Sequence, residues 1–144
     1  MGERNSDAER RQILEEARTI AVLGAHPDES RPAFYVPDYL HRHGYRVVPV
    51  NPRFAGDALW GEVVRSRLDE IAAPVDVVDV FRRAGAVDAH LEELLAMRPA
   101  PRVVWLQSGI RNDRVAAALV AAGIDVVQDH CTMADHRRFG IVAR

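Results

Sequence analysis

The chain has 144 residues, about the length of one domain, and its 48% apolar and 28% charged residues are typical of a folded globular protein. A formal net charge of −2 gives no overall basic excess for binding nucleic acid or an anionic membrane. All 19 basic residues are arginine, which excludes chemistry that needs a lysine, such as a Schiff base or a phosphate-binding P-loop. One cysteine cannot form an internal disulfide, and no apolar run reaches the roughly 18 residues of a membrane helix. We therefore expect a cytoplasmic protein.

The predicted elements alternate between helix and strand. A helix is expected over residues 6–17, with Ser6 and Asp7 as its caps, and further helical segments over residues 34–43, 86–97 and 112–122, with a weak turn at 68–71. Five short apolar runs, typical of strands buried on both faces, lie at residues 20–23, 46–50, 75–80, 102–106 and 124–127. This alternation predicts an α/β fold: a Rossmann-like, doubly wound sheet of five parallel strands in three layers.

Pro37 lies inside the second helical segment. An interior proline costs a helix about 3 kcal/mol, so we expect that helix to begin at Pro37, with residues 30–36 as a looser entry. Residues 1–18 are expected to form an N-terminal helix packed on a single domain of residues 19–144.

In parallel sheets ligands bind beyond the carboxyl ends of the strands, so the residues that follow each run are the candidate site. After the first run come Gly24, Ala25, His26, Ser30, Arg31 and Pro32. Gly24 permits close approach of a ligand, and the following helix offers free N–H groups to a phosphate. Only the first glycine of the G-x-G-x-x-G motif is present, so a plain strand-to-helix turn is the alternative interpretation.

The second run is followed by Asn51, Pro52 and Arg53, where a protein that binds NAD places an acidic residue for the ribose. This disfavours NAD. Arg53 is suited instead to a phosphate on the ribose, as in NADP or coenzyme A, unless it is only a solvated loop arginine.

The remaining strand ends add arginines and small polar residues. Phe81, Arg82 and Arg83 follow the third run, and with Arg31 and Arg53 the two arginines are predicted to form a local cationic rim. The fourth run leads into Gln107, Ser108, Gly109 and Ile110, and the fifth is followed by Cys131. The six histidines lack the spacing of a metal site, and no serine lies in a Gly-x-Ser-x-Gly motif, so we expect neither a metal nor a catalytic residue.

Together these strand ends resemble the small CoA-binding protein family, single-domain relatives of the CoA-binding domain of the succinyl-CoA synthetase α subunit. The segments that carry the resemblance, in chain order, are IAVLGAHPDESRPAFYV, HGYRVVPVNPRFAG, PVDVVDVFRR, VVWLQSGIRN and AGIDVVQDHCTMADH. The resemblance implies a Rossmann-like fold that binds coenzyme A with the strand-end residues named above. The first loop would lie near the diphosphate, the turns 51–53 and 81–83 near the adenosine and its phosphates, and the turn 108–110 near the pantetheine arm.

We therefore expect a protein that binds coenzyme A or an acyl-CoA and has no catalytic machinery of its own, since the phosphohistidine domain and partner subunit of the larger relatives have no counterpart in 144 residues. The alternatives are an NADP-binding redox or sensor protein and an interaction module that has lost its ligand. Cys131 is expected to be a buried core cysteine, the commoner fate of a free cysteine. The alternative is that His130 beside it, if charged, favours the thiolate and exchange with the disulfide of oxidised CoA.

Overall fold

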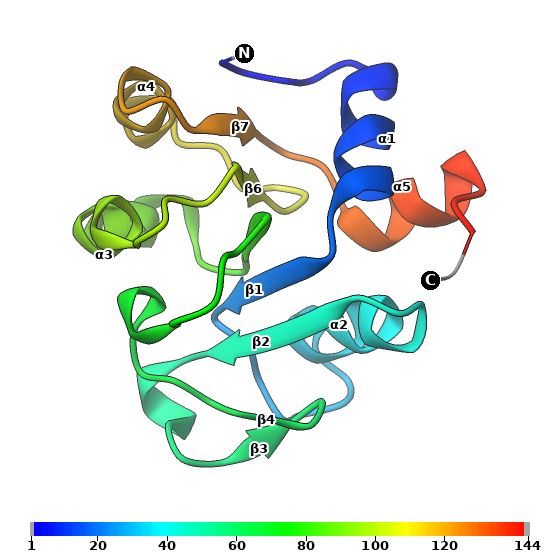
Figure 1. Cartoon of the computed structure of the whole chain (residues 1–144), viewed down its shortest axis with the longest axis vertical. Helices are drawn as coiled ribbons and strands as arrows, with labels where there is room; N and C mark the ends of the chain where they lie inside the picture. Colours follow the sequence, from blue (N-terminus) through cyan, green and yellow to red (C-terminus); the bar gives the residue numbers. More distant parts are fainter. Residues whose placement is uncertain (1, 143–144) are drawn as a thin grey trace.

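The fold is built on one central parallel sheet, shown in Figure 1 for a computed structural model that describes residues 2–142. Its strands are β1 (Thr19–Leu23), β2 (Arg46–Val50), β5 (Val77–Val80), β6 (Val103–Leu106) and β7 (Asp125–Val127). They lie in the order β2-β1-β5-β6-β7, and every neighbouring pair is parallel. The predicted Rossmann-like sheet of five parallel strands is confirmed.

Helices cover both faces of the sheet and complete the three layers. The α-helices are α1 (Asp7–Glu16), α2 (Pro32–Arg42), α3 (Leu91–Ala96), α4 (Asp113–Ala121) and α5 (Thr132–Phe139). Short 3₁₀ helices lie at η1 (Pro52–Phe54), η2 (Leu68–Glu70) and η3 (Ala84–His90), and β3 (Ala58–Leu59) pairs with β4 (Glu62–Val63) in a small hairpin. In Figure 1 α3 and α4 lie on one side of the sheet, and α1, α2 and α5 lie on the other.

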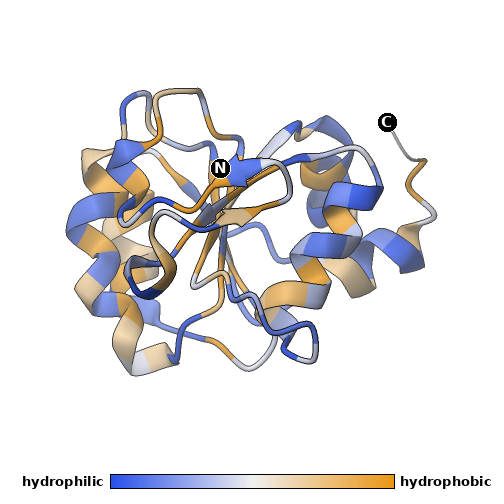
Figure 2. Ribbon diagram, turned by 90° about the horizontal axis from the view of Figure 1, so that it is seen from below, coloured by the Kyte–Doolittle hydropathy of each residue, from blue (hydrophilic) through white to orange (hydrophobic). Residues whose placement is uncertain are grey.

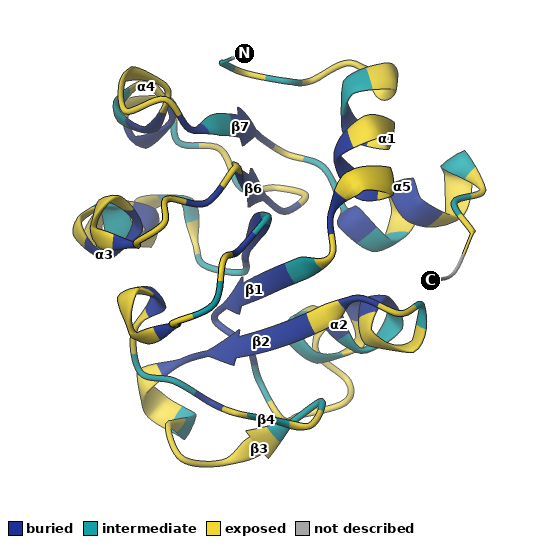
Figure 3. Ribbon diagram, viewed as in Figure 1, coloured by how far each residue is buried: buried dark blue, intermediate teal, exposed yellow. Residues whose placement is uncertain are grey.

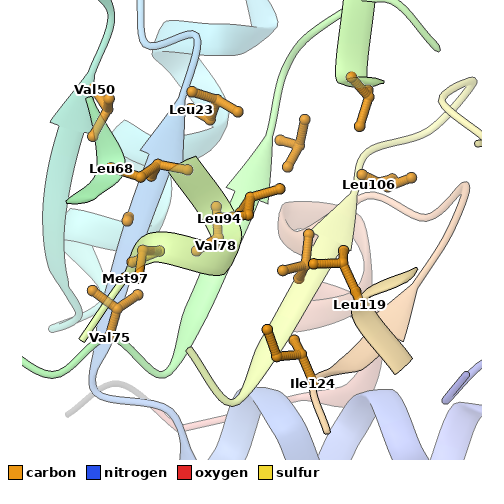
Figure 4. Packing of buried hydrophobic residues seen from close by; sticks show 14 of the residues in the cluster. Leu23, Val50, Leu68, Val75, Val78, Leu94, Met97, Leu106, Leu119 and Ile124 are labelled. Atoms are coloured by element: carbon orange, nitrogen blue, oxygen red, sulfur yellow. The ribbon is translucent and has the colours of Figure 1, made fainter. Parts of the chain in front are cut away.

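Each face of the sheet packs against its own apolar core, because successive side chains of a strand point to opposite faces. Val78 and Val80 of β5 face the core beneath α3 and α4, which Figure 4 shows with Leu94 and Leu119 packed onto the strands. On the other face, Trp105 is fully buried beneath α1, α2 and α5. Apart from the first residues of β1, β2 and β7, the strands of the sheet are buried (Figure 3), and they are mostly apolar (Figure 2), as their near-continuous apolar sequence predicts.

The first helix is held by its cap and by a buried ion pair. The Ser6 hydroxyl accepts a hydrogen bond from the Glu9 N–H, and the Glu9 carboxylate accepts one from the Ser6 N–H, which forms a capping box. Arg10 is buried and donates to Asp135 of α5 at 2.8 Å. This pair joins α1 to α5 on the same side of the sheet.

The helix containing Pro37 begins earlier than its sequence suggests. α2 starts at Pro32, not Pro37, and continues through the interior proline. Proline has no N–H to donate to the carbonyl four residues earlier, that of Ala33, but the Ala33 carbonyl accepts a hydrogen bond from the N–H of His26 in the preceding loop. The first loop therefore supplies a donor that Pro37 cannot.

Two further elements were not expected from the sequence. The tail folds into α5, and residues 58–63 form the β3–β4 hairpin beside β2. The segment 86–97 is divided between η3 and α3. No helix in the described part of the chain is long and apolar enough to cross a membrane.

Candidate functional site

Two adjoining cavities lie beyond the carboxyl ends of the sheet strands. The larger has a volume of about 670 Å³ and is bordered by the ends of β5 and β6 and by the first turns of α2 and α5. The smaller, of about 370 Å³, lies between the ends of β1, β2 and β5. Arg31, Ala33, Phe81 and Arg82 line both cavities. Both volumes lie in the range of small-molecule sites. The smaller cavity lies at the switch point of the sheet, where β1 has β2 on one side and β5 on the other.

Gly24 lets the first loop pass close to the end of β5. Its φ is +92°, and a Cβ placed on it would lie 2.4 Å from the carbonyl oxygen of Phe81. No larger residue fits this contact, so the glycine allows the β1 and β5 ends to converge. Beyond it, His26 packs edge-on against Phe54 at a ring separation of 4.8 Å. Partial burial lowers the pKa of His26, and the charges of Arg31 and Arg53 lower it further.

The side-chain amide of Asn51, at the end of β2, forms its hydrogen bonds within the protein. Its Nδ2 donates to the carbonyl of Ala25 at 2.9 Å, and its Oδ1 accepts from the backbone N–H of Arg53 at 3.0 Å and from Arg82 at 3.4 Å. The side chain is 4% exposed. Asn51 thus ties the first loop, η1 and the end of β5 together, as a structural support of the smaller cavity.

Three arginines of the site have no carboxylate partner. Arg53, Arg82 and Arg83 make no ion pair with any residue in the described range 2–142, whereas Arg31 lies 3.7 Å from Asp28. The Nε of Arg82 is buried and has no hydrogen-bond partner among these residues. Guanidinium groups without a carboxylate partner at a cavity wall create a positive site in a chain whose net charge is negative.

A closed polar network lies beneath the larger cavity. Asp79 of β5 is fully buried and accepts hydrogen bonds from Gln107 and, at 2.9 Å, from the hydroxyl of Thr132. Gln107 also donates to the Thr132 hydroxyl oxygen at 2.8 Å. Burial raises the pKa of Asp79 to about 7, although both hydrogen bonds favour the ionised form.

The turn after β6 brings its backbone to the wall of the larger cavity. Gly109 has φ +82°, and its N–H donates to the carboxylate of Asp129 at 2.6 Å. The N–H of Ile110 donates to the carbonyl of Gln107 at 2.9 Å, which closes the turn. Because Gly109 adopts a left-handed conformation, the turn can present Ser108 and Ile110 to the cavity.

The surroundings of Cys131 favour a neutral thiol over the reactive thiolate. Cys131 lines the larger cavity at the start of α5, but burial raises the pKa of its thiol, and the nearby charges of Asp79 and Asp135 raise it further. His130 is half-buried and is not among the causes of this shift.

The structure brings most of the predicted site residues to the two cavities. Those that line them are Gly24, His26, Arg31, Pro32, Asn51, Pro52, Arg53, Phe81, Arg82, Arg83, Gln107, Ser108, Gly109, Ile110 and Cys131. Ala25 and Ser30 do not. Ala25, in the first loop, is fully buried, and Ser30 is exposed, with its hydroxyl donating to the carboxylate of Asp28 at 2.7 Å.

The prediction from the sequence missed the apolar side of the larger cavity. Tyr35 and Val36 of α2, Ala84 of η3 and Met133 of α5 also line it. Tyr35 is 43% exposed, so part of its ring is accessible. A search beyond the strand ends, into the first turn of each following helix, would have included these residues. Among residues 2–142, no group of three or more His, Cys, Asp and Glu side chains is placed to hold a metal ion.

A parallel sheet with its cavities at the carboxyl ends of the strands defines an α/β protein of the Rossmann-like class. Within that class, residues 18–137 match the CoA binding domain family, and the chain belongs to this family. It is 35% identical over 131 residues to the uncharacterized protein YneT of Bacillus subtilis, covering 91% of this chain and 94% of that protein.

Solved structures of similar chains support the assignment. The structure of cell-free ID.343 from Thermus thermophilus is 55% identical, with a TM-score of 0.87 over 92% of this chain and 98% of that one. A hypothetical protein from Pyrococcus horikoshii OT3 is 32% identical, with a TM-score of 0.84 over 92% and 91%. The resemblance on which the sequence-based interpretation depends is thus confirmed, and it supports a binding role related to coenzyme A.

Proposed function

We propose that this protein binds coenzyme A or an acyl-CoA across the two adjoining cavities and acts as a binding protein without a catalytic group of its own. The nucleotide occupies the smaller cavity, where its phosphates meet Arg53 and Arg82, and Arg83 lines the larger cavity. The pantetheine arm runs through the larger cavity past Gln107 and the turn 108–110. Arg31 and the first turn of α2 lie at the junction, near the diphosphate. The family match supports the ligand class, and the lining of each cavity supports this orientation.

The observation that carries the proposal is the buried Nε of Arg82, which has no hydrogen-bond partner among residues 2–142. A buried donor without an acceptor costs about 1–3 kcal/mol, and a phosphate oxygen in the cavity would remove that cost. Arg82 lines both cavities, so a ligand whose charged phosphates join a nucleotide to an uncharged arm places its phosphates beside it. Arg53, whose guanidinium lies 5.0 Å from the ring centre of Phe54, is positioned for the phosphate on the ribose.

The contacts of Asn51 argue against a nicotinamide dinucleotide. In proteins that bind NAD, an acidic residue at the end of the second strand accepts hydrogen bonds from the ribose hydroxyls. Here Asn51 occupies that place and both of its polar atoms already have partners within the protein. NADP, which also carries a phosphate on its ribose, remains the competing ligand, and a protein partner for the arginines is the competing role.

Calorimetric titration of the purified protein with CoA, NADP and NAD tests the ligand class. We expect CoA to bind more tightly than both dinucleotides. Native mass spectrometry of the protein as purified provides an independent readout, with the mass of CoA or an acyl-CoA as the expected bound species. Equal or tighter binding of NADP or NAD overturns the proposal, and failure of all three ligands to bind favours an interaction module.

A further inference from the structure

Gln107 has a side-chain amide of which only one end is used inside the protein. Both hydrogens of its Nε2 are engaged, one by Asp79 and the other by the Thr132 hydroxyl at 2.8 Å. The Thr132 hydroxyl donates its own hydrogen to Asp79, so the three side chains form a closed ring. In the structure the amide nitrogen of Gln107 faces Asp79 and Thr132, the orientation that an ionised Asp79, which only accepts hydrogen bonds, favours. In this orientation the carbonyl oxygen, Oε1, is not part of the ring.

That oxygen has no hydrogen-bond partner among residues 2–142, yet it is absent from the buried unpartnered atoms of this part of the chain. It is therefore accessible, although the residue as a whole is only 5% exposed. Gln107 lines the larger cavity, and Oε1 is the side-chain polar atom that its contacts within the protein leave free to face it. A rigid acceptor is thus presented to whatever occupies that space.

The neighbouring strand end provides a direct contrast. Gln128 follows β7 and is 2% exposed, but its Nε2 donates to Glu3 and Asp113, at 2.8 and 3.0 Å, and its Oε1 accepts from the N–H of Asn112 at 2.7 Å. All of its polar atoms have partners within the protein. Two buried glutamines at adjacent strand ends therefore differ in one respect: only Gln107 keeps an acceptor for a ligand.

From this geometry we infer that Gln107 selects the ligand by accepting a hydrogen bond from a secondary amide N–H of the pantetheine arm, and that Asp79 and Thr132 are positioning residues that hold its acceptor toward the cavity. The inference rests on the proposed function. A carbonyl oxygen repels phosphate and requires a donor, and the pantetheine arm carries two amide N–H groups on an otherwise weakly polar chain. The apolar side chains of Tyr35, Val36 and Met133 around the same cavity suit that chain.

Matched ligands and variants separate this inference from the proposed function. The ligands are CoA and adenosine 3′,5′-bisphosphate, which carries phosphates on the ribose but lacks the pantetheine arm. The variants are Gln107→Leu and, as a buried control at the next strand end, Gln128→Leu. We expect Gln107→Leu to weaken CoA binding roughly tenfold, the value of one hydrogen bond, and to leave binding of the bisphosphate unchanged. Gln128→Leu is expected to leave the ratio of the two affinities at the parent value.

The positioning role is tested at Thr132, where a conservative replacement keeps the hydroxyl. Thr132→Val removes one acceptor from Gln107 and one donor to Asp79, and is expected to weaken CoA several-fold without changing bisphosphate binding. Thr132→Ser is expected to restore the parent affinity for CoA. Equal losses for both ligands in Gln107→Leu, or an unchanged CoA affinity, overturn the inference. If the parent protein binds neither CoA nor the bisphosphate, the proposed function itself is wrong, whatever the role of Gln107.

A measurement on the parent protein keeps the inference testable if Gln107→Leu does not fold. The chain has three glutamines, Gln12, Gln107 and Gln128, so labelling with ¹⁵N-glutamine gives three pairs of side-chain NH₂ signals. We expect CoA to shift the Gln107 pair, because a hydrogen bond to Oε1 polarises the amide, and the bisphosphate to leave it in place. The Gln12 and Gln128 signals are internal controls. A Gln107 signal that does not respond to bound CoA contradicts the inference.

Discussion

The carbonyl oxygen of Phe81 lies 2.4 Å from the position that a Cβ on Gly24 would occupy. This contact joins the ends of β1 and β5, the two strands between which the chain changes direction across the sheet. The Nε of Arg82 would lie 3.4 Å from the same Cβ. The absence of a side chain at Gly24 therefore leaves room for the buried Nε of Arg82, and it links the conformation of the first loop to the cationic part of the site.

Gly24→Ala is expected to destabilise the protein by about 2–4 kcal/mol, because it adds a backbone collision to the cost of a positive φ. Gly56→Ala is the matched control: φ there is +94°, but nothing lies within 4 Å of the added Cβ, so only the conformational cost of about 1–2 kcal/mol applies. Urea unfolding measures both. Equal losses of stability in Gly24→Ala and Gly56→Ala would show that the contact with Phe81 adds no cost.

Arg82→Ala and Arg53→Ala are each expected to weaken CoA binding by about 1.5–3 kcal/mol, the contribution of one hydrogen bond to a charged group. The effect should diminish as salt is raised, since the contacts are electrostatic. Calorimetry with each variant gives the affinity, and circular dichroism shows whether it is folded.

Arg18→Ala provides the charge-matched control for these variants. Arg18 is exposed and precedes β1, at the opposite end of the strand from the cavities, so its removal changes the net charge equally without touching the site. It is expected to bind CoA like the parent. If Arg53→Ala and Arg82→Ala also bind CoA like the parent while folded, the arginines are only solvated.

The buried Asp79 makes stability depend on pH in a defined direction. Its pKa is raised from 3.8 to about 7 in the folded protein, so between these values the folded state binds more protons than the unfolded state. The contribution of this group to stability is therefore fully present below about pH 4 and is lost as pH rises to about 7, a change of about 4 kcal/mol. Carboxylates on the surface whose pKa is lowered, such as Glu62, act in the opposite direction.

Asp79→Asn isolates this contribution, because the other titrating groups are shared with the parent. We expect the free energy of unfolding of the parent, relative to that of the variant, to fall between pH 4 and pH 7 and to be constant above pH 8. Denaturant unfolding at each pH supplies both curves. A difference that does not vary with pH, or one that rises, contradicts the assignment.

The fold could be predicted from the sequence because its strands are buried on both faces and its first helix carries its own cap. Near-continuous apolar runs located β1, β2, β5, β6 and β7 to within two residues, and Ser6 located the start of α1. Most residues of the candidate site could be predicted from one topological rule, that ligands bind beyond the carboxyl ends of parallel strands.

The structural features that the sequence did not predict depend on tertiary contacts. α5 has a mostly polar sequence, and it is stabilised by packing on α1 and α2 and by the buried pair between Arg10 and Asp135, which are 125 residues apart in the chain. The start of α2 at Pro32 depends on the N–H of His26, a donor from outside the helix. The network of Asp79, Gln107 and Thr132 joins three separate segments, and no local pattern in the sequence indicates such a meeting.

Cys131 offers a probe of the larger cavity through its reactivity. The thiolate is the reactive form, and burial raises the pKa of this thiol, so we expect slow alkylation by iodoacetamide at pH 7 and a rate that rises on approach to pH 9 and above. CoA at about ten times its dissociation constant should slow the reaction roughly tenfold, because the unoccupied fraction falls by that factor. Adenosine 3′,5′-bisphosphate, which lacks the arm proposed to occupy this cavity, should protect less.

Intact-mass measurement over time gives these rates, and Cys131→Ser, which removes the only thiol, shows whether any other residue is modified. Cys131 lines the larger cavity and not the smaller one, so the difference between the two ligands reports where the pantetheine arm lies. Equal protection by both ligands would place the nucleotide, not the arm, in the larger cavity. An alkylation rate that CoA leaves unchanged would mean that the arm does not reach Cys131, and the proposed orientation of the ligand would then be wrong.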